Sequence, residues 1–332
     1  MAFVPLRKYF LAEAPFPSSG PPVEQLSITA GFSHLLFSMV LENSVHLEDF
    51  KSVVDTYTTE FQTGVELDSH DFLLYLLDQF ASETPPNNAN FVKFICSGTF
   101  RSLKHCNRCR QTPSIVFDPF TTISLPLTSQ AVGRSQKKAK TLKILSEFDL
   151  EHCLRCLITP EVLSGDNTVN CEHCQQAHET ISRITISTLP PLLIFQLKRF
   201  EISSSSQKIT ASVSFPLTNL DMAPYLSEST SSTTTSLHVP PTNTYSLFAI
   251  TNHHGDSIHF GHYTADVRSD ITGNWISFNG SATPRETLAS EFEANNKTAY
   301  ILFYLRDDFA PTIFFTTPSD TSVSAAAMED DL

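Results

Sequence analysis

Two side chains near the C-terminal end of the sequence have the types needed for acid–base chemistry beside a nucleophile. His262 begins an alternating extended segment, and Asn279 ends a second extended run after a polar break over residues 269–273. If the two runs form an antiparallel hairpin that turns between Asp270 and Ile271, His262 lies directly opposite Asn279. Cross-strand Cβ atoms lie ~4.5–5.5 Å apart, so we expect the imidazole and the carboxamide to hydrogen-bond.

A histidine held in one tautomer by a side-chain oxygen forms two parts of a catalytic triad, which a thiol or hydroxyl nucleophile completes. The alternative is a histidine that has only a structural role on a strand. The hairpin pattern by itself does not separate these two interpretations.

Paired cysteines indicate a second kind of chemistry, metal binding. Cys106 and Cys109 form one Cys-x-x-Cys pair, and Cys171 and Cys174 form another. Each pair places two thiolates on one side of a tight turn, and two pairs complete a tetrahedral set for Zn²⁺. Four protein ligands leave no open coordination position, so the sequence predicts a structural zinc site.

The other three cysteines are expected to be buried and unreactive. Cys153 and Cys156 repeat the spacing, but their segment has a helical apolar pattern that favours packing over metal binding. Cys96 lies in an apolar run without a basic neighbour that would lower its pKa. A total of seven cysteines, most of them in widely separated pairs, favours a reducing compartment, the cytoplasm or nucleus, over a disulfide framework.

The segments that must position these residues include both helices and strands. Residues 27–45 and 66–80 have helical apolar spacing, and Asp68 is a suitable N-cap with Asp71 three residues later. Residues 189–200 read as an apolar strand with a basic, aromatic end; if this end has no functional role, the segment is a core strand whose charged end groups reach solvent.

Composition restricts the function further. The chain has 332 residues, of which 41% are hydrophobic, enough for a sizeable core. A net charge of −13, without a stripe of Lys and Arg, argues against a zinc-stabilised nucleic-acid binder. No stretch approaches the ~20 apolar residues of a membrane span, and no signal peptide is evident.

The C-terminal third resembles the His box of the ubiquitin-specific proteases, papain-like thiol hydrolases that cut the isopeptide bond after ubiquitin's C-terminal glycine. The matching residues are Tyr245–Ile250, His254–Gly255, Gly261–Tyr263, Trp275, Phe278–Asn279 and Ala299–Tyr304. Residues 66–73 resemble the family's Gln-Gln-Asp-Ala-His-Glu-Phe-Leu motif, with Glu66 and Leu67 in place of the two glutamines. The strand that ends Leu-Lys-Arg-Phe at Phe200 and the placement of the cysteine pairs are also similar. Residues 215–217 and 220–226 continue the resemblance, nearest to the histone-deubiquitinating branch.

This resemblance implies an α+β, papain-like fold over residues 1–308. A helical thumb (residues 1–82) would face a β-rich palm (residues 200–308), and zinc-bearing β fingers would lie within about 94–200. Residues 129–140 and 227–242, which are rich in polar or basic residues, are expected to be disordered insertions, and residues 309–332 a disordered tail.

The resemblance also assigns roles to individual residues. His262 would be the general base, and Asn279 would orient it without help from the next position, where Gly280 replaces an aspartate common in the family. The residues expected to contact ubiquitin are Asp68, Asp71, Phe200, Gly261 and Tyr263.

The nucleophile of the family lies in a cysteine-bearing box, and no cysteine precedes Cys96 in this sequence. Residues 1–11 resemble the segment immediately C-terminal to that box, so the box is expected upstream of Met1. Two interpretations stay open: an N-terminally truncated deubiquitinase, or a catalytically inactive ubiquitin-binding scaffold. Both imply ubiquitin and ubiquitinated proteins as partners and zinc as cofactor.

Overall fold

The structure is a computed structural model in which thirteen segments of the chain are described. They are residues 10, 25–39, 47–62, 67–84, 90–110, 114–127, 147–200, 208–227, 241–257, 260–269, 272–280, 282–290 and 296–309. The expected insertion at 129–140 lies outside this set, as do residues 228–240 and 310–332 of the second insertion and the tail.

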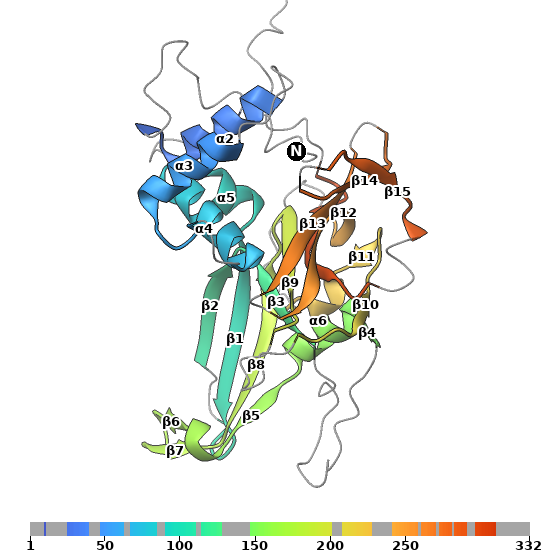
Figure 1. Cartoon of the computed structure of the whole chain (residues 1–332). Coiled ribbons are helices and arrows are strands. Elements are labelled where there is room, and N and C mark those ends of the chain that lie inside the picture. Colours follow the sequence, from blue (N-terminus) through green and yellow to red (C-terminus); the bar gives the residue numbers. More distant parts are fainter. Residues whose placement is uncertain are drawn as a thin grey trace, which may run out of the picture.

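Four helices form one layer of the molecule (Figure 1). They are α2 (Ile28–Phe37), α3 (Leu47–Tyr57), α4 (Ser69–Ser82) and α5 (Phe91–Ile95). As the sequence predicts, Asp68 caps α4, with its carboxylate accepting from the backbone N–H of His70 at 2.7 Å. At the other end of α4, the Glu83 carboxylate accepts from the first two backbone N–H groups of α2 at 3.0 and 2.8 Å. The two helices are therefore joined end to end by a charge-assisted cap.

A mixed sheet lies beside the helices (Figure 1). Its strand order is β15-β14-β13-β12-β16-β9-β3, and β11 pairs with β12. The strands are β3 (Ile123–Pro126), β9 (Leu192–Lys198), β11 (Leu220–Asp221), β12 (Thr244–Ser257), β13 (Phe260–Arg268), β14 (Trp275–Phe278), β15 (Arg285–Thr287) and β16 (Ala299–Arg306). All neighbours are antiparallel except β3 and β9. Strands β12 to β15 follow one another in the sequence and are neighbours in the sheet, so they form a meander. This meander carries both candidate acid–base residues.

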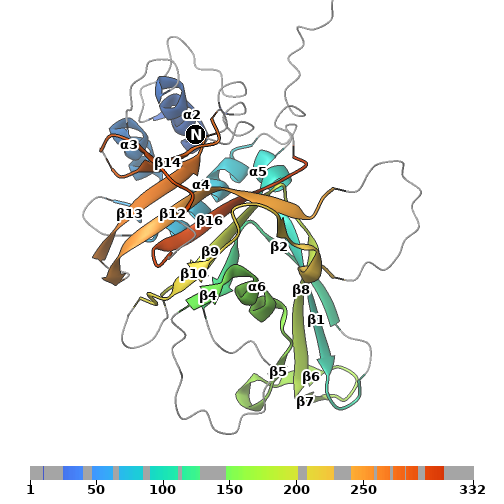
Figure 2. The same cartoon turned by 90° about the vertical axis from the view of Figure 1, so that its right-hand side faces the viewer.

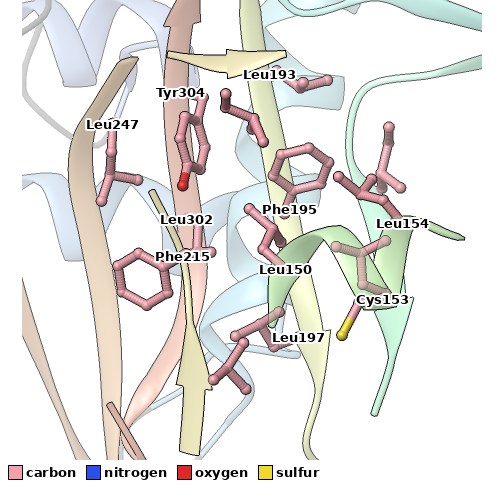
Figure 3. Close-up of a cluster of buried hydrophobic side chains, with 14 of the residues drawn as sticks. Leu150, Cys153, Leu154, Leu193, Phe195, Leu197, Phe215, Leu247, Leu302 and Tyr304 are labelled. Carbon is pink, nitrogen blue, oxygen red and sulfur yellow. The ribbon is translucent and has the colours of Figure 1, made fainter. Parts of the chain in front are cut away.

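The sheet separates two hydrophobic cores because successive side chains of β9 point to opposite faces. Leu192 and Ile194 join the core under the helices, whereas Leu193, Phe195 and Leu197 join the core on the other face. That second core is closed by α6 (Leu150–Ile158) and its buried Cys153, as Figure 3 shows. Beside α6 lie β4 (Glu147–Asp149) and β10 (Ser212–Ser214), a parallel pair, and the short helix η4 (Ala223–Tyr225) (Figure 2).

A second sheet extends away from the helices and the central sheet (Figures 1 and 2). Its order is β2-β1-β8-β5, with the cysteine-bearing pair β6–β7 at its far end. The elements are β1 (Gly98–Cys106), β2 (Ser114–Phe120), β5 (Glu161–Leu163), η3 (Gly165–Asn167), β6 (Val169–Cys171), β7 (Gln176–His178) and β8 (Thr180–Thr188). We call this second sheet the finger sheet. It lies in the part of the sequence where the zinc-bearing region was expected.

Within the described residues, no helix combines the length and the apolar character needed to cross a membrane.

Candidate active site and metal centre

The predicted contact between His262 and Asn279 is present. The His262 Nε2 atom lies 2.5 Å from the Asn279 Oδ1 atom. His262 belongs to β13, and Asn279 follows the last residue of β14. The exact pairing expected from the sequence is wrong by two residues, because β13 and β14 pair Asp266 with Ser277.

The different register has a local cause and leaves the contact intact. Ser269 and Asn274 close the turn through a backbone hydrogen bond of 2.8 Å, and Gly273 adopts a φ of 75° within it. In this register Asn279 lies diagonally across from His262. A shift by two residues keeps every side chain on its own face of the sheet, and diagonal neighbours remain within reach of long side chains.

His262 and Asn279 open into a cavity of 420 Å³ on one face of the β12–β15 meander. All but one of its lining residues are polar: Asn252, His254, His262, Thr264, Asp266, Ser277, Asn279, Ala282, Thr283, Arg285, Thr287, Asn296 and Thr298. The alternation of β13 places His262, Thr264 and Asp266 on this face. A polar cavity that holds an oriented imidazole is suited to proton transfer at a bound substrate.

A second imidazole stands beside the first. His254 of β12 pairs across the strands with His262 of β13, and its Nε2 atom lies 2.9 Å from the Thr264 Oγ1 atom. Burial lowers the pKa of His254, and electrostatic interaction with Lys208 and His262 lowers it further, against an opposing effect of Asp266. His254 therefore favours the neutral state.

A cysteine nucleophile is not supplied to this cavity by any described residue. All seven cysteines lie in described segments, and none lines the cavity. Cys96 and Cys153 are fully buried, and burial raises the pKa of each thiol to about 12. The sequence-based expectation that they are unreactive core residues agrees with these surroundings, although Cys96 ends helix α5 instead of lying in a strand. Cys156, which was also expected to be buried, is only partly buried.

Two of the residues expected to contact ubiquitin, Phe200 and Tyr263, belong to an aromatic cluster of four rings on the other face of β13. Phe200 and Tyr263 both contact the ring of His253, with centroids 5.2 and 4.9 Å away. Tyr300 completes the cluster, 5.7 Å from Phe200 and 6.3 Å from Tyr263. The cluster thus joins the end of β9 to β12, β13 and β16.

Gly261 has an intramolecular role that the sequence did not indicate. It was expected to contact ubiquitin. In the structure a Cβ atom at Gly261 would lie 2.2 Å from His253 Nε2 and 2.6 Å from the carbonyl oxygen of His254. The hydrogen of glycine therefore allows the His253 ring to pack directly against β13.

The two candidate acids at the start of α4 differ in their surroundings. Besides capping α4, the carboxylate of Asp68 accepts a hydrogen bond from the hydroxyl of Tyr300. Asp71 is exposed, and its pKa is raised by partial burial and by the negative charges of Asp68 and Glu60. Asp68 is thus already bonded within the chain, whereas Asp71 remains accessible to a basic ligand.

The four cysteines predicted to bind metal lie together at the tip of the finger sheet. The sulfur atoms of Cys106, Cys109, Cys171 and Cys174 are all within 4.8 Å of one another. The Cys109 and Cys171 sulfurs are 3.7 Å apart, which is far beyond a disulfide bond and close to the ~3.8 Å edge of a tetrahedron with Zn–S of ~2.3 Å. Four thiolates in this arrangement fit a structural zinc ion.

The two cysteine turns have the same backbone design. The backbone N–H of Arg110 donates to the Cys106 carbonyl at 3.1 Å, and that of Gln175 donates to the Cys171 carbonyl at 2.8 Å. Both donors have positive φ, 51° and 54°. In the first turn, backbone N–H groups of Cys109 and Arg108 point at the Cys106 sulfur and lower its pKa to about 7, which favours the thiolate that a metal requires.

Arg199 and Lys208 are buried basic residues that the sequence did not reveal. Arg199 was expected to reach solvent from the end of its strand, but its side chain is fully buried. The N–H groups of its guanidinium donate to four backbone carbonyls. Lys208 is also buried and donates to the carbonyl of His253 at 2.5 Å. A basic side chain at the end of an apolar strand carries no signal in the sequence that separates these two outcomes.

Comparison with known proteins agrees with this arrangement. A family model described as "Ubiquitin carboxyl-terminal hydrolase" matches residues 1–304. Ubiquitin carboxyl-terminal hydrolase 2 of Bos taurus is 29% identical over 287 residues, which cover 77% of this chain and 43% of the relative. The protein of that name from Gallus gallus is 29% identical over 310 residues, covering 84% of this chain and 79% of the relative. Ubiquitin carboxyl-terminal hydrolase 51 of Mus musculus is 32% identical over 262 residues, covering 73% of this chain and 38% of the relative.

Solved structures show the same fold. The SAGA Ubp8/Sgf11/Sus1/Sgf73 DUB module bound to ubiquitin aldehyde matches with a TM-score of 0.64 at 23% identity, over 87% of this chain and 60% of that one. The yeast SAGA DUB module with an Sgf73 mutant matches with a TM-score of 0.67 at 21% identity, over 92% of this chain and 63% of that one. The chain thus spans less than two thirds of these structures and about two fifths of the cattle and mouse relatives.

Proposed function

The chain belongs to the ubiquitin carboxyl-terminal hydrolase family, and from this premise we propose that it recognises ubiquitin and serves hydrolysis of the isopeptide bond after ubiquitin's last glycine. The observation that carries the proposal is the 2.5 Å contact between His262 Nε2 and Asn279 Oδ1 at the edge of a polar cavity.

This contact suits His262 to the role of general base. A carboxamide oxygen only accepts hydrogen bonds, so Nε2 carries the proton and Nδ1 keeps its lone pair. Nδ1 would take the proton of a cysteine thiol as the sulfur attacks the carbonyl carbon, and would return it to the leaving lysine amine. Asn279 would hold the ring in this tautomer throughout.

The metal centre would have a supporting role. Bound Zn²⁺ would cross-link the ends of β1 and β6, and with four thiolate ligands it would have no position for water or substrate. We propose that the zinc-braced finger sheet and Asp71 both contact ubiquitin. Asp71 is exposed, so its carboxylate can pair with an arginine side chain of ubiquitin. None of the seven cysteines forms a disulfide, which suits a reducing compartment, and we propose the cytoplasm or nucleus as the location.

A binding measurement tests recognition. Fluorescence anisotropy of labelled ubiquitin, titrated with the purified chain, is expected to show saturable binding that weakens when the last two glycines of ubiquitin are removed. Asp71→Asn should weaken the binding of intact ubiquitin, whereas Glu48→Gln, a substitution of an exposed acid on α3, should leave it unchanged. Equal binding of intact and shortened ubiquitin would contradict recognition of the tail.

A kinetic measurement tests hydrolysis. The protein purified at the length that its own gene encodes is expected to release a fluorophore from the C-terminus of ubiquitin. His262→Ala and Asn279→Ala should each lower kcat by at least about 100-fold, because proton transfer contributes about 10²–10⁴. Binding without hydrolysis would instead support the non-catalytic scaffold, which the family match does not favour.

A further inference from the structure

Arg199 binds the backbone of Asn296, a residue that lines the candidate active-site cavity. It follows β9, its side chain is 0% exposed, and burial lowers the pKa of its guanidinium to about 10, so it remains charged at neutral pH. A buried cation must be compensated by hydrogen-bond acceptors or by an opposite charge. The acceptors that bind the Arg199 guanidinium therefore show which segments of the chain Arg199 holds in place.

The guanidinium binds two separate segments of the chain. Its Nη1 donates to the carbonyls of Ile209 at 3.0 Å and Ala211 at 2.8 Å, in the segment that leads into β10. Its Nε donates to Ala299 at 2.5 Å and its Nη2 to Asn296 at 3.1 Å, in the segment that leads into β16. The planar fork of arginine can reach four carbonyls at once, which the single ammonium of lysine cannot.

From Thr298, within the segment that Arg199 holds, side-chain hydrogen bonds run to the strand that carries His262. The Thr298 hydroxyl has one proton, which it donates to Asn252 Oδ1 at 3.1 Å. Asn296 Oδ1, 3.3 Å away, is the alternative acceptor and itself accepts from the Ala299 backbone N–H at 2.7 Å. Asn252 Nδ2 then donates to Asp266 Oδ2 at 2.5 Å. Asn252, Asp266 and Asn296 are buried, and all four residues line the same cavity as His262.

This chain of hydrogen bonds lies near the active site, where β12 is joined to β16, its neighbour on the side away from β13. The β12–β16 ladder covers Tyr245–Leu247 opposite Tyr304–Arg306, at the far end of both strands. Toward the site, β12 is tied to β16 by the backbone bond from His253 to the Thr298 carbonyl, 2.8 Å, and by the Asn252–Thr298 contact. The position of the β12–β13 hairpin at the site therefore depends on the segment that Arg199 holds.

We propose that Arg199 is a positioning residue for His262: by fixing residues 296–299 it sets, through Thr298 and Asn252, the place of the β12–β13 hairpin and hence the His262–Asn279 contact. The proposal rests on the proposed function, in which that contact orients the general base. Arg199 itself is not among the residues that contact His262 or line the cavity, and it acts only through the network.

Two variants break the network at different points. Arg199→Lys keeps the charge but loses the fork, and Thr298→Val removes the hydroxyl while leaving every Arg199 contact in place. Arg155→Lys is the matched control, because Arg155 is an exposed arginine of α6 that pairs with Asp149 and Glu151. If Arg199→Lys fails to fold, Thr298→Val still tests the network.

The first readout is the imidazole itself and needs no catalysis. Two-bond ¹H–¹⁵N spectra of the chain with ¹⁵N-labelled histidine, assigned with His262→Gln among the twelve histidines, report the tautomer of His262. We expect the single Nε2–H tautomer in the wild type and in Arg155→Lys, and a mixture of tautomers in Arg199→Lys and Thr298→Val. An unchanged His262 tautomer in both folded network variants would overturn the proposal.

The second readout is kinetic, on the protein at the length its gene encodes. We expect kcat to fall by about tenfold or more in both network variants while KM stays within a factor of about two, since orientation of the base matters in the chemical step. An equal loss in kcat and in ubiquitin binding would indicate general destabilisation. That result would count against Arg199 as a positioning residue for His262. A wild type without hydrolysis would contradict the catalytic part of the proposed function, and the tautomer measurement would still decide the role of Arg199.

Discussion

Tyr300 donates its hydroxyl to the carboxylate of Asp68, two residues that are 232 positions apart in the sequence. The same hydroxyl accepts from Gln196 Nε2 at 2.8 Å, and Gln196 Oε1 accepts from Ser124 at 2.6 Å. These bonds cross β3, β9 and β16 and end at the N-cap of α4. They attach the helices to the sheet beside the aromatic cluster, so the helix that carries the candidate acids is fixed relative to the strands that carry His262.

Removal of the Tyr300 hydroxyl should therefore weaken the attachment between helix and sheet. We expect Tyr300→Phe to lower the free energy of unfolding by about 1.5–3 kcal/mol, the usual contribution of a hydrogen bond to a charged group. Tyr304→Phe in the same strand is the control, because it loses a bond to the backbone carbonyl of Pro216 and should cost about 0.5–1.5 kcal/mol. Urea unfolding measures both, and a smaller loss in Tyr300→Phe than in Tyr304→Phe would contradict a stabilising role for the Asp68–Tyr300 bond.

Stability should fall in mildly acidic solution because of His70. This residue of α4 is buried, its Nε2 atom lies 3.0 Å from Thr122 Oγ1, and burial lowers its pKa below the ordinary value of about 6.5. Below that pH the unfolded chain binds a proton that folded His70 resists, so the free energy of unfolding decreases as the pH falls. His254, whose pKa is also lowered, contributes with the same sign.

The measurement is urea unfolding between pH 7.5 and 5.5. His70→Gln should flatten the decrease. An equally steep decrease in His70→Gln would show that other groups cause it.

Metal removal should affect the finger sheet before the rest of the chain. One zinc ion per chain is expected by elemental analysis of the purified protein, and Cys109→Ser should lose it. A strong chelator should then release backbone amides of β6 and β7 to hydrogen exchange while β9 and β16 stay protected, since the metal joins only the finger turns. Cys156→Ser is the control and should keep the metal, because Cys156 lies in α6. Full zinc occupancy in Cys109→Ser would contradict the four-cysteine site.

The sequence was informative where local chemistry decides the structure. The Asp68 cap, the two cysteine turns and the side of the sheet that His262 faces all follow from spacing over a few residues. The His262–Asn279 contact was predicted through an incorrect register and still forms, because an error of two residues preserves the face. The actual register depends on the positive φ of Gly273, which the polar break at residues 269–273 did not reveal.

Burial of charge could not be predicted in this way. Whether Arg199 reaches solvent or binds four carbonyls depends on residues 209–211 and 296–299, which tertiary structure brings to it. The same holds for Asp68, whose second partner comes from the last strand of the sheet. Sequence spacing describes a residue's neighbours along the chain, and most of these contacts are made across about one hundred residues or more.

Alanine substitutions at Gly261 and Gly273 allow the steric cost of an added Cβ atom to be separated from the cost of backbone strain. Alanine at Gly261 would place Cβ 2.2 Å from His253 Nε2 and 2.6 Å from the His254 carbonyl oxygen, so the β12–β13 pair would have to separate. We expect a loss of about 3 kcal/mol or more, as in severe overpacking. Alanine at Gly273 meets no atom within 4 Å and only strains a φ of 75°, which should cost about 1–2 kcal/mol. Thermal and urea unfolding of both variants measures the difference.

A double variant then identifies the obstacle at Gly261. His253→Ala removes the ring but not the backbone carbonyl of His254, so it should recover only part of the stability lost in Gly261→Ala. Coupling between the two substitutions is expected because they are in contact. Additive losses would mean that the ring does not occupy the space beside Gly261, and the aromatic cluster would then not depend on that glycine.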